Sequence, residues 1–220
     1  MRQNLLIVIA SMSYALAACG GAALTPEEGL GVNEEGVVTL TAATFDATYQ
    51  APFCAGVGAA CDSGALLNGR SDTFPEANRP NTLEASCADG TWSGYFAKRA
   101  IEHLTVSTPD GSALEAGKTV KLEATVYAYS LVQDKLDLFY TANVENPSWT
   151  YLGTYTPSRS GLNTFAVTYT LPAGGVQAVR ANFRFVDSSN TNSAPSICST
   201  GNYDDHDDLL FAVRSPVAFH

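Results

Sequence analysis

The densest group of chemically active side chains in this sequence lies in YDDHDDLLFAV, residues 203–213. Four aspartates and one histidine occupy consecutive positions, and an apolar run typical of a β-strand follows directly. Carboxylate oxygens are the ligands that calcium prefers in proteins. We therefore predict that Asp204, Asp205, Asp207 and Asp208 bind a structural calcium ion at the start of this strand.

Two other interpretations of the aspartate block stay open. Arg180 and Arg184 lie on one face of the preceding strand, so they could pair with the aspartates and offset their repulsion. Alternatively, the block is a solvated turn, as runs of like charge usually are. A transition metal is not favoured, because His206 is a single imidazole among carboxylates and soft-metal sites gather several nitrogen or sulfur ligands.

The cysteines predict two disulfide bonds. Cys54 and Cys61 enclose the short loop CAGVGAAC, which has little else to order it, so we pair them and leave Cys87 with Cys198. Four cysteines allow three connectivities, and zinc is disfavoured because no Cys-x-x-Cys pair occurs. The second bridge would bring Asp89 close to the aspartate block, which makes it a further calcium ligand.

The N-terminus has the features of an export signal. Residues 1–18 combine Arg2 with an apolar stretch too short to span a bilayer. The Leu-Ala-Ala-Cys sequence that ends at Cys19 resembles the lipobox of bacterial lipoproteins, although cleavage after Ala17 is an alternative. Lipidation of Cys19 would also leave an even number of cysteines for disulfides.

The lipobox resemblance implies a membrane anchor in the cell envelope. Gly20 follows the cysteine, which favours the outer membrane if the host has one. Residues 19–36 are rich in Gly, Ala and Glu and predict a flexible acidic tether.

The composition predicts a globular chain that does not bind nucleic acids. With 12 basic and 22 acidic residues, the net charge is -10, whereas nucleic-acid and anionic-membrane surfaces require basic patches. Hydrophobic residues make up 45% and charged residues only 15% of the chain, which excludes a disordered protein. We expect a monomer.

Turn residues alternate with short runs rich in Val, Thr, Tyr and Phe, as in an all-β domain. The clearest runs are residues 118–130, 135–142, 149–155, 163–171 and 176–185. We predict a sandwich of two antiparallel sheets of jelly-roll type over residues 37–214, followed by a tail at 215–220. The segment 51–84 has few strand signals and predicts a long, disulfide-stapled loop.

Four aromatic residues are candidates for a binding surface: Trp92, Trp149, Tyr151 and Tyr155. Sugar rings stack on aromatic side chains that keep one edge in water. Trp149 and Tyr151 share a face of one predicted strand, and Tyr155 extends the row. The alternative is that these rings fill the space between the sheets.

CADG at residues 87–90 and YDDHDDL at 203–209 are the most specific marks of a wider similarity over residues 45–213. This region resembles a β-sandwich module of secreted proteases and other exported proteins of predatory and environmental bacteria, notably myxobacteria. The resemblance implies an extracellular, non-catalytic module for binding or attachment.

The sequence indicates no enzyme. It lacks Gly-x-Ser-x-Gly, His-Glu-x-x-His and a Gly-rich phosphate loop, and glycoside hydrolysis would need two carboxyls roughly 5–10 Å apart in a cleft. The first hypothesis is a lipid-anchored module that binds a carbohydrate or another cell-surface ligand. The second is a structural or protein-interaction lipoprotein, which buried rather than exposed aromatics at Trp149 and Tyr151 would favour.

Overall fold

The computed structural model describes residues 40–94, 98–189 and 192–215. The predicted signal peptide, Cys19, the acidic tether and residues 216–220 lie outside the described residues. Within those ranges the regular structure is β-strand, apart from one 3-10 turn, η1 (Leu83–Ala85). No helix in the described ranges has the length and apolar character needed to cross a membrane.

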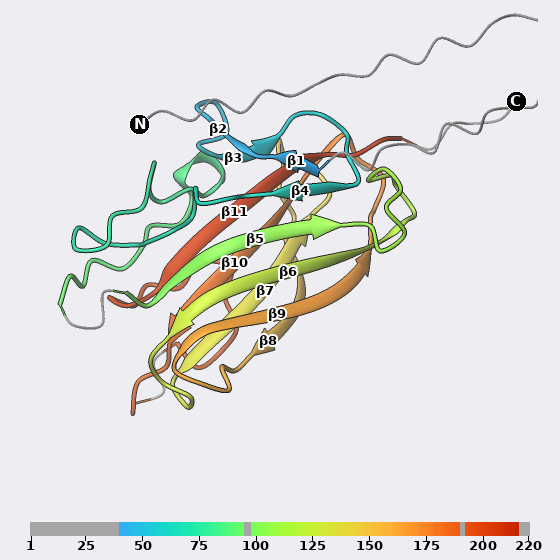
Figure 1. Ribbon diagram of the computed structural model, residues 1–220. Helices are drawn as coiled ribbons and strands as arrows, with labels where there is room; N and C mark the ends of the chain where they lie inside the picture. Colours follow the sequence, from blue (N-terminus) through green and yellow to red (C-terminus); the bar gives the residue numbers. More distant parts are fainter. Residues whose placement is uncertain (1–39, 95–97, 190–191, 216–220) are drawn as a thin grey trace, which may run out of the picture. The chain divides into compact units, whose positions relative to one another are not determined.

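The strands form two sheets that pack face to face, which confirms the predicted all-β sandwich (Figure 1). The five-stranded sheet has the order β1 (Leu40–Ala42), β4 (Ala60–Asp62), β5 (Ala100–Ser107), β6 (Thr119–Ala128), β9 (Gly161–Thr170). The six-stranded sheet has the order β2 (Thr44–Asp46), β3 (Ala51–Cys54), β11 (Asp205–Ala212), β10 (Val176–Phe185), β7 (Asp134–Thr141), β8 (Thr150–Tyr155). Neighbours are antiparallel except for the parallel pairs β1–β4 and β3–β11.

The hydrophobic core lies between the sheets because side chains alternate across each strand. In β6 every second residue from Val120 to Ala128 is fully buried, as its alternating sequence predicts. Val179, Ala181 and Phe183 of β10 contribute the opposite wall of the same core. Burial of this apolar surface is the main source of stability for such a sandwich.

The predicted loop at 51–84 is wrong in its first part, which contains β3 and β4. These strands are only four and three residues long, so they carry too little alternation to be recognised from sequence and depend on their neighbours. The Cys54–Cys61 disulfide joins them, with Cα atoms 5.8 Å apart, and thereby links the two sheets. The irregular segment instead covers residues 63–94, with η1 inside it; we call it the long loop.

The long loop lies along the open edge of β11. Strand β3 pairs with β11 only at Leu210 and Phe211. Beyond that point the loop supplies partners: Asp208 N donates to Asn81 O at 3.0 Å, and Gly90 N donates to Asp204 O at 2.7 Å. This arrangement brings loop carboxylates against the aspartate block.

Candidate metal centre

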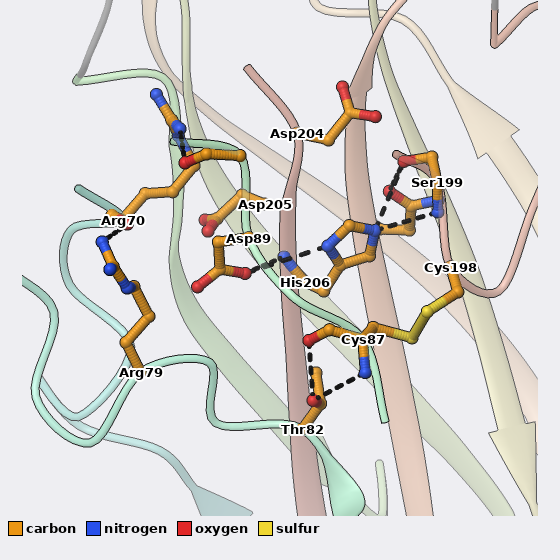
Figure 2. A network of polar contacts seen from close by, with 12 residues as sticks. Arg70, Arg79, Thr82, Cys87, Asp89, Cys198, Ser199, Asp204, Asp205 and His206 are labelled. Atoms are coloured by element: carbon orange, nitrogen blue, oxygen red, sulfur yellow. Dashed lines mark hydrogen bonds and ion pairs between the residues drawn. A yellow bond between two sulfur atoms is a disulfide. The ribbon is translucent and has the colours of Figure 1, made fainter. Parts of the chain in front are cut away.

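The aspartate block lies in β11 except for Asp204, which directly precedes it, so the side chains of Asp205 to Asp208 alternate between the two faces of the six-stranded sheet. Asp205 and Asp207 continue the inward row of Leu209 and Phe211, which belong to the main core. The side chains between them point to the outer face. Figure 2 shows the result: the carboxylates of Asp205 and Asp204 lie on opposite sides of the strand.

On the outer face, Asp208 forms a two-pronged ion pair with Arg180. Nε and Nη2 of Arg180 each lie 2.7 Å from a carboxylate oxygen of Asp208, and Leu83 N donates to Asp208 Oδ2 at 2.7 Å. Both side chains are almost completely buried. The arginine-pairing interpretation therefore holds for Asp208, which is not available as a calcium ligand.

Asp204 is also satisfied without a metal. Its carboxylate accepts hydrogen bonds from Phe185 N at 2.8 Å, Gly201 N at 2.8 Å and Asn192 Nδ2 at 3.0 Å. The other arginine of the predicted pair does not contact the block, since Arg184 Nε lies 2.6 Å from Asp137 Oδ2. The structure thus removes Asp204 and Asp208 from the predicted ligand set.

On the inner face, four carboxylates meet at one end of the sandwich: Glu76, Asp89, Asp205 and Asp207. We call them the acidic cluster. One oxygen each of Glu76, Asp89 and Asp205 lie within 4.8 Å of one another, and Figure 2 shows the carboxylates of Asp89 and Asp205 side by side. Two oxygens that bind the same calcium ion at roughly 2.4 Å can be up to about that far apart.

Most of the oxygens in the acidic cluster lack a donor. Asp207 is fully buried, and its carboxylate faces another carboxyl, that of Glu76, rather than an N–H or hydroxyl donor of the described residues. Glu76 Oε2, Asp89 Oδ2 and Asp205 Oδ1 are likewise buried and unpartnered within the described ranges. Buried polar groups are normally hydrogen-bonded, and a buried charge without a partner is costly.

Burial raises the pKa of every carboxyl in the acidic cluster. For Glu76, burial and then the negative charge of Asp89 raise the pKa from 4.5 to about 8. Burial, followed by the charges of neighbouring carboxylates, holds the pKa values of Asp205 and Asp207 well above the ordinary range. Burial also raises the pKa of Asp89. All four groups therefore resist ionisation unless a positive charge joins them.

Two arginines supply part of that positive charge. Arg79 favours the ionised forms of Glu76 and Asp89, and Arg70 favours that of Asp205. When all four carboxyls are ionised, the two guanidinium groups leave an excess of two negative charges. The buried triad of Glu76, Asp89 and Asp205 could therefore hold a metal ion, and a divalent cation would balance the whole acidic cluster.

Sequence reasoning missed Glu76 and a neutral candidate ligand, Asn81. Asn81 is fully buried and its Oδ1 lacks a partner among the described residues, while its Nδ2 donates to Ala77 O at 2.7 Å. Neither residue stands in a recognisable motif. Only the path of the long loop along β11 brings them to the acidic cluster.

His206 lies on the outer face beside the cluster rather than in it. Its Nδ1 is 3.8 Å from Asp89 Oδ1, and its Nε2 accepts a hydrogen bond from Ser199 N at 3.0 Å. Its main-chain N–H donates to Asp89 Oδ1 at 3.1 Å. The histidine thus helps to position Asp89 through the backbone.

The predicted row of Trp149, Tyr151 and Tyr155 does not form a platform. A bulge opposite Leu138 and Phe139 shifts the register of β8 and turns Tyr155 toward the core. Trp149 is partly buried, with the Arg180 guanidinium 4.4 Å above its ring. Tyr151 is 47% exposed but lies against Phe139 and stands alone in the row.

The second predicted disulfide joins two chain segments beside the acidic cluster. Cys87 and Cys198 are bonded, with Cα atoms 5.3 Å apart, and they tie the long loop to the segment that precedes β11. This bridge brings Asp89 to the aspartate block as the sequence predicts.

The chain was compared with protein-family models, curated proteins and solved structures, and none of them matches it. The resemblance to a module of exported bacterial proteins therefore stays a prediction.

Proposed function

We propose that this chain is a lipid-anchored, extracytoplasmic, non-catalytic binding module whose sandwich end is held together by calcium. The ligands are the four members of the acidic cluster, with Asn81 Oδ1 as a fifth oxygen. The observation that carries the proposal is Asp207, a fully buried carboxylate that faces the Glu76 carboxyl and accepts no hydrogen bond from an N–H or hydroxyl of the described residues. A cation supplies the missing partner.

The donor set favours calcium over other metals. All the candidate ligand atoms are oxygens, which hard cations prefer, whereas zinc favours nitrogen and sulfur. Magnesium usually keeps several bound waters and uses one or two carboxylates. An enclosed site with four carboxylates suits calcium better, since calcium accepts six to eight oxygens in a flexible geometry.

The location of the module is inferred from its N-terminus and its cysteines. Arg2, the apolar stretch and the lipobox-like end at Cys19 support export and anchoring to the cell envelope. The two disulfides fit an oxidising compartment outside the cytoplasm.

Burial of the acidic cluster supports a non-catalytic role. The side chain of Asp89 is 1% exposed, and Asp205 and Asp207 are fully buried. Glycoside hydrolysis needs carboxyls that face an open cleft able to admit the substrate. Carboxylates enclosed in this way are better placed to hold an ion than to reach a glycosidic bond.

A second candidate is a structural or protein-interaction lipoprotein without a small ligand. The partial burial of Trp149 and Tyr155 favours it, because the aromatic row that would have formed a binding face is mostly occupied in packing. Calcium would stabilise the fold in the same way in either case.

Calcium is expected to raise the melting temperature of the full-length chain, purified in detergent after treatment with a chelator. At a concentration one hundred times the dissociation constant, a ligand that binds only the folded state adds about 2.7 kcal/mol. For a domain of this size that gain corresponds to about 5–10 °C. Magnesium at the same concentration serves as the control and should give a smaller shift. Identical melting curves with calcium and with chelator would contradict the proposal.

A further inference from the structure

Two neighbouring hollows form a groove beside the acidic cluster. The first has a volume of about 390 Å³, and its lining includes Asp89, Ser199 and Thr200. The second has a volume of about 330 Å³ and lies around Trp92 and Ser93. Both hollows are lined by Thr91 and Asn202, so they adjoin each other. Ligand sites in proteins commonly measure roughly 300–1,000 Å³.

The walls of this groove are fixed by one buried arginine. Arg70 Nη1 donates to Gly90 O at 2.6 Å and to Asn202 O at 3.3 Å, and Nη2 donates to Trp92 O at 3.3 Å. The two walls also bond directly, since Trp92 N donates to Asn202 O at 3.0 Å. A groove held in this way loses little conformational entropy when it binds a ligand.

Gly90 shows how closely the two walls approach each other. A Cβ atom at this position would lie 2.3 Å from the carbonyl carbon and oxygen of Asn202. Only glycine fits there, so the close packing of these two segments depends on the Gly of the CADG stretch.

Trp92 offers a supported aromatic surface at the open end of the groove. It is 43% exposed, and its ring lies 5.4 Å from that of Tyr203. Tyr203 in turn packs on Phe185 at 5.1 Å. Gly94 lies against the indole edge, where an added Cβ would come within 2.8 Å of the indole nitrogen. The indole is therefore held in place while much of it faces water.

We propose that this groove binds a neutral carbohydrate, a ligand class that rests on the proposed function as a binding module. An exposed indole can stack on a sugar ring, and the adjacent Thr91, Ser93 and Asn202 offer hydroxyl and amide groups for sugar hydroxyls. Among the described lining residues of both hollows there is no Lys or Arg. An acidic sugar would therefore find no cationic partner.

Calcium occupancy is expected to affect this groove because Asp89 belongs to both sites. Asp89 contributes to the groove lining and to the triad whose oxygens lie within 4.8 Å. Arg70 also connects them, since it faces the charges of Asp205 and Asp89 and binds both groove walls. Loss of the ion would release Asp89 from the other members of the acidic cluster and loosen the segment that lines the groove, so chelation should weaken carbohydrate binding.

The fluorescence of Trp92 can report the binding of a ligand in the groove. The chain has two tryptophans, so Trp149→Phe leaves Trp92 as the single indole and keeps an aromatic ring under Arg180. The full-length variant, in a non-glycosidic detergent with calcium, is titrated with β-1,4-glucan, β-1,3-glucan, xylan and mannan oligosaccharides. Oligogalacturonate is the acidic comparison. We expect a saturable change in Trp92 fluorescence with at least one neutral sugar and none with oligogalacturonate.

Substitutions separate the two sites. Asn202→Ala is expected to weaken the binding of that sugar at least tenfold without changing the calcium-induced rise in melting temperature. Affinity electrophoresis tests sugar binding by the unsubstituted chain, which still has Trp149. The gels contain the polysaccharides that correspond to the titrated oligosaccharides. Calcium stabilisation without retardation or fluorescence change by any neutral sugar would overturn the carbohydrate inference and leave the calcium proposal standing. Sugar binding without calcium stabilisation would support the groove and overturn the calcium proposal.

Discussion

Asp208→Ala is expected to lower the free energy of unfolding by about 3–5 kcal/mol, the range for breaking a buried ion pair by removing one partner. Arg180 is 2% exposed and would lose both of its bonds to the carboxylate. Leu83 N would lose its acceptor as well. Denaturant unfolding monitored by circular dichroism measures the loss.

A matched double variant shows whether the unpaired charge of Arg180 causes this loss of stability. Arg180→Met combined with Asp208→Leu removes both charges and should recover most of the stability, because apolar replacements of a buried pair are often neutral or stabilising. Lys118→Ala breaks an exposed pair with Asp110 and should have little effect. If Asp208→Ala changes stability no more than Lys118→Ala, the ion pair does not support the outer face of β11.

Asp207→Asn is expected to have opposite effects with and without calcium. In calcium-free protein it should stabilise the fold by about 1–3 kcal/mol, the cost usually assigned to an unsatisfied buried polar group. The amide is nearly isosteric and can donate to the carboxylate of Glu76, which lies within hydrogen-bond range of Asp207. With calcium present, the same change removes a charged ligand and should abolish most of the calcium-induced rise in melting temperature.

Asp204→Asn is the control for this substitution. Asp204 lies in the same block but on the opposite face of the sheet, where three described donors satisfy its carboxylate. Its amide variant should destabilise the domain with and without calcium and leave the calcium effect intact. Equal responses of the two variants to calcium would mean that the alternation along β11 does not define the site.

The sequence predicts the sandwich well because its long strands carry clear alternation and its turns carry Pro and Gly. It also predicts both disulfides and part of the acidic cluster. The expectation that all four aspartates act together fails because Asp205, Asp207 and Asp208 lie inside β11, where side chains alternate between the faces, and only Asp204 precedes it. Period-two alternation then sends Asp205 and Asp207 inward and Asp204 and Asp208 outward.

Other features depend on contacts that no local pattern encodes. Glu76 reaches the acidic cluster through the path of the long loop, which is fixed by hydrogen bonds to β11. Tyr155 points inward because a bulge in β8 reverses the alternation that the sequence suggests. The groove around Trp92 exists because Arg70, far away in sequence, binds both of its walls. These are tertiary effects, so sequence periodicity does not predict them.

The most direct test of the calcium site is a calorimetric titration of calcium into the full-length, chelator-treated chain. The proposed site predicts one calcium ion bound per chain and no binding to the Asp205→Asn/Asp207→Asn double variant, which loses the two inward carboxylates. Absence of binding to the unsubstituted chain, or unchanged binding to the double variant, would contradict the assignment of the acidic cluster as a calcium site.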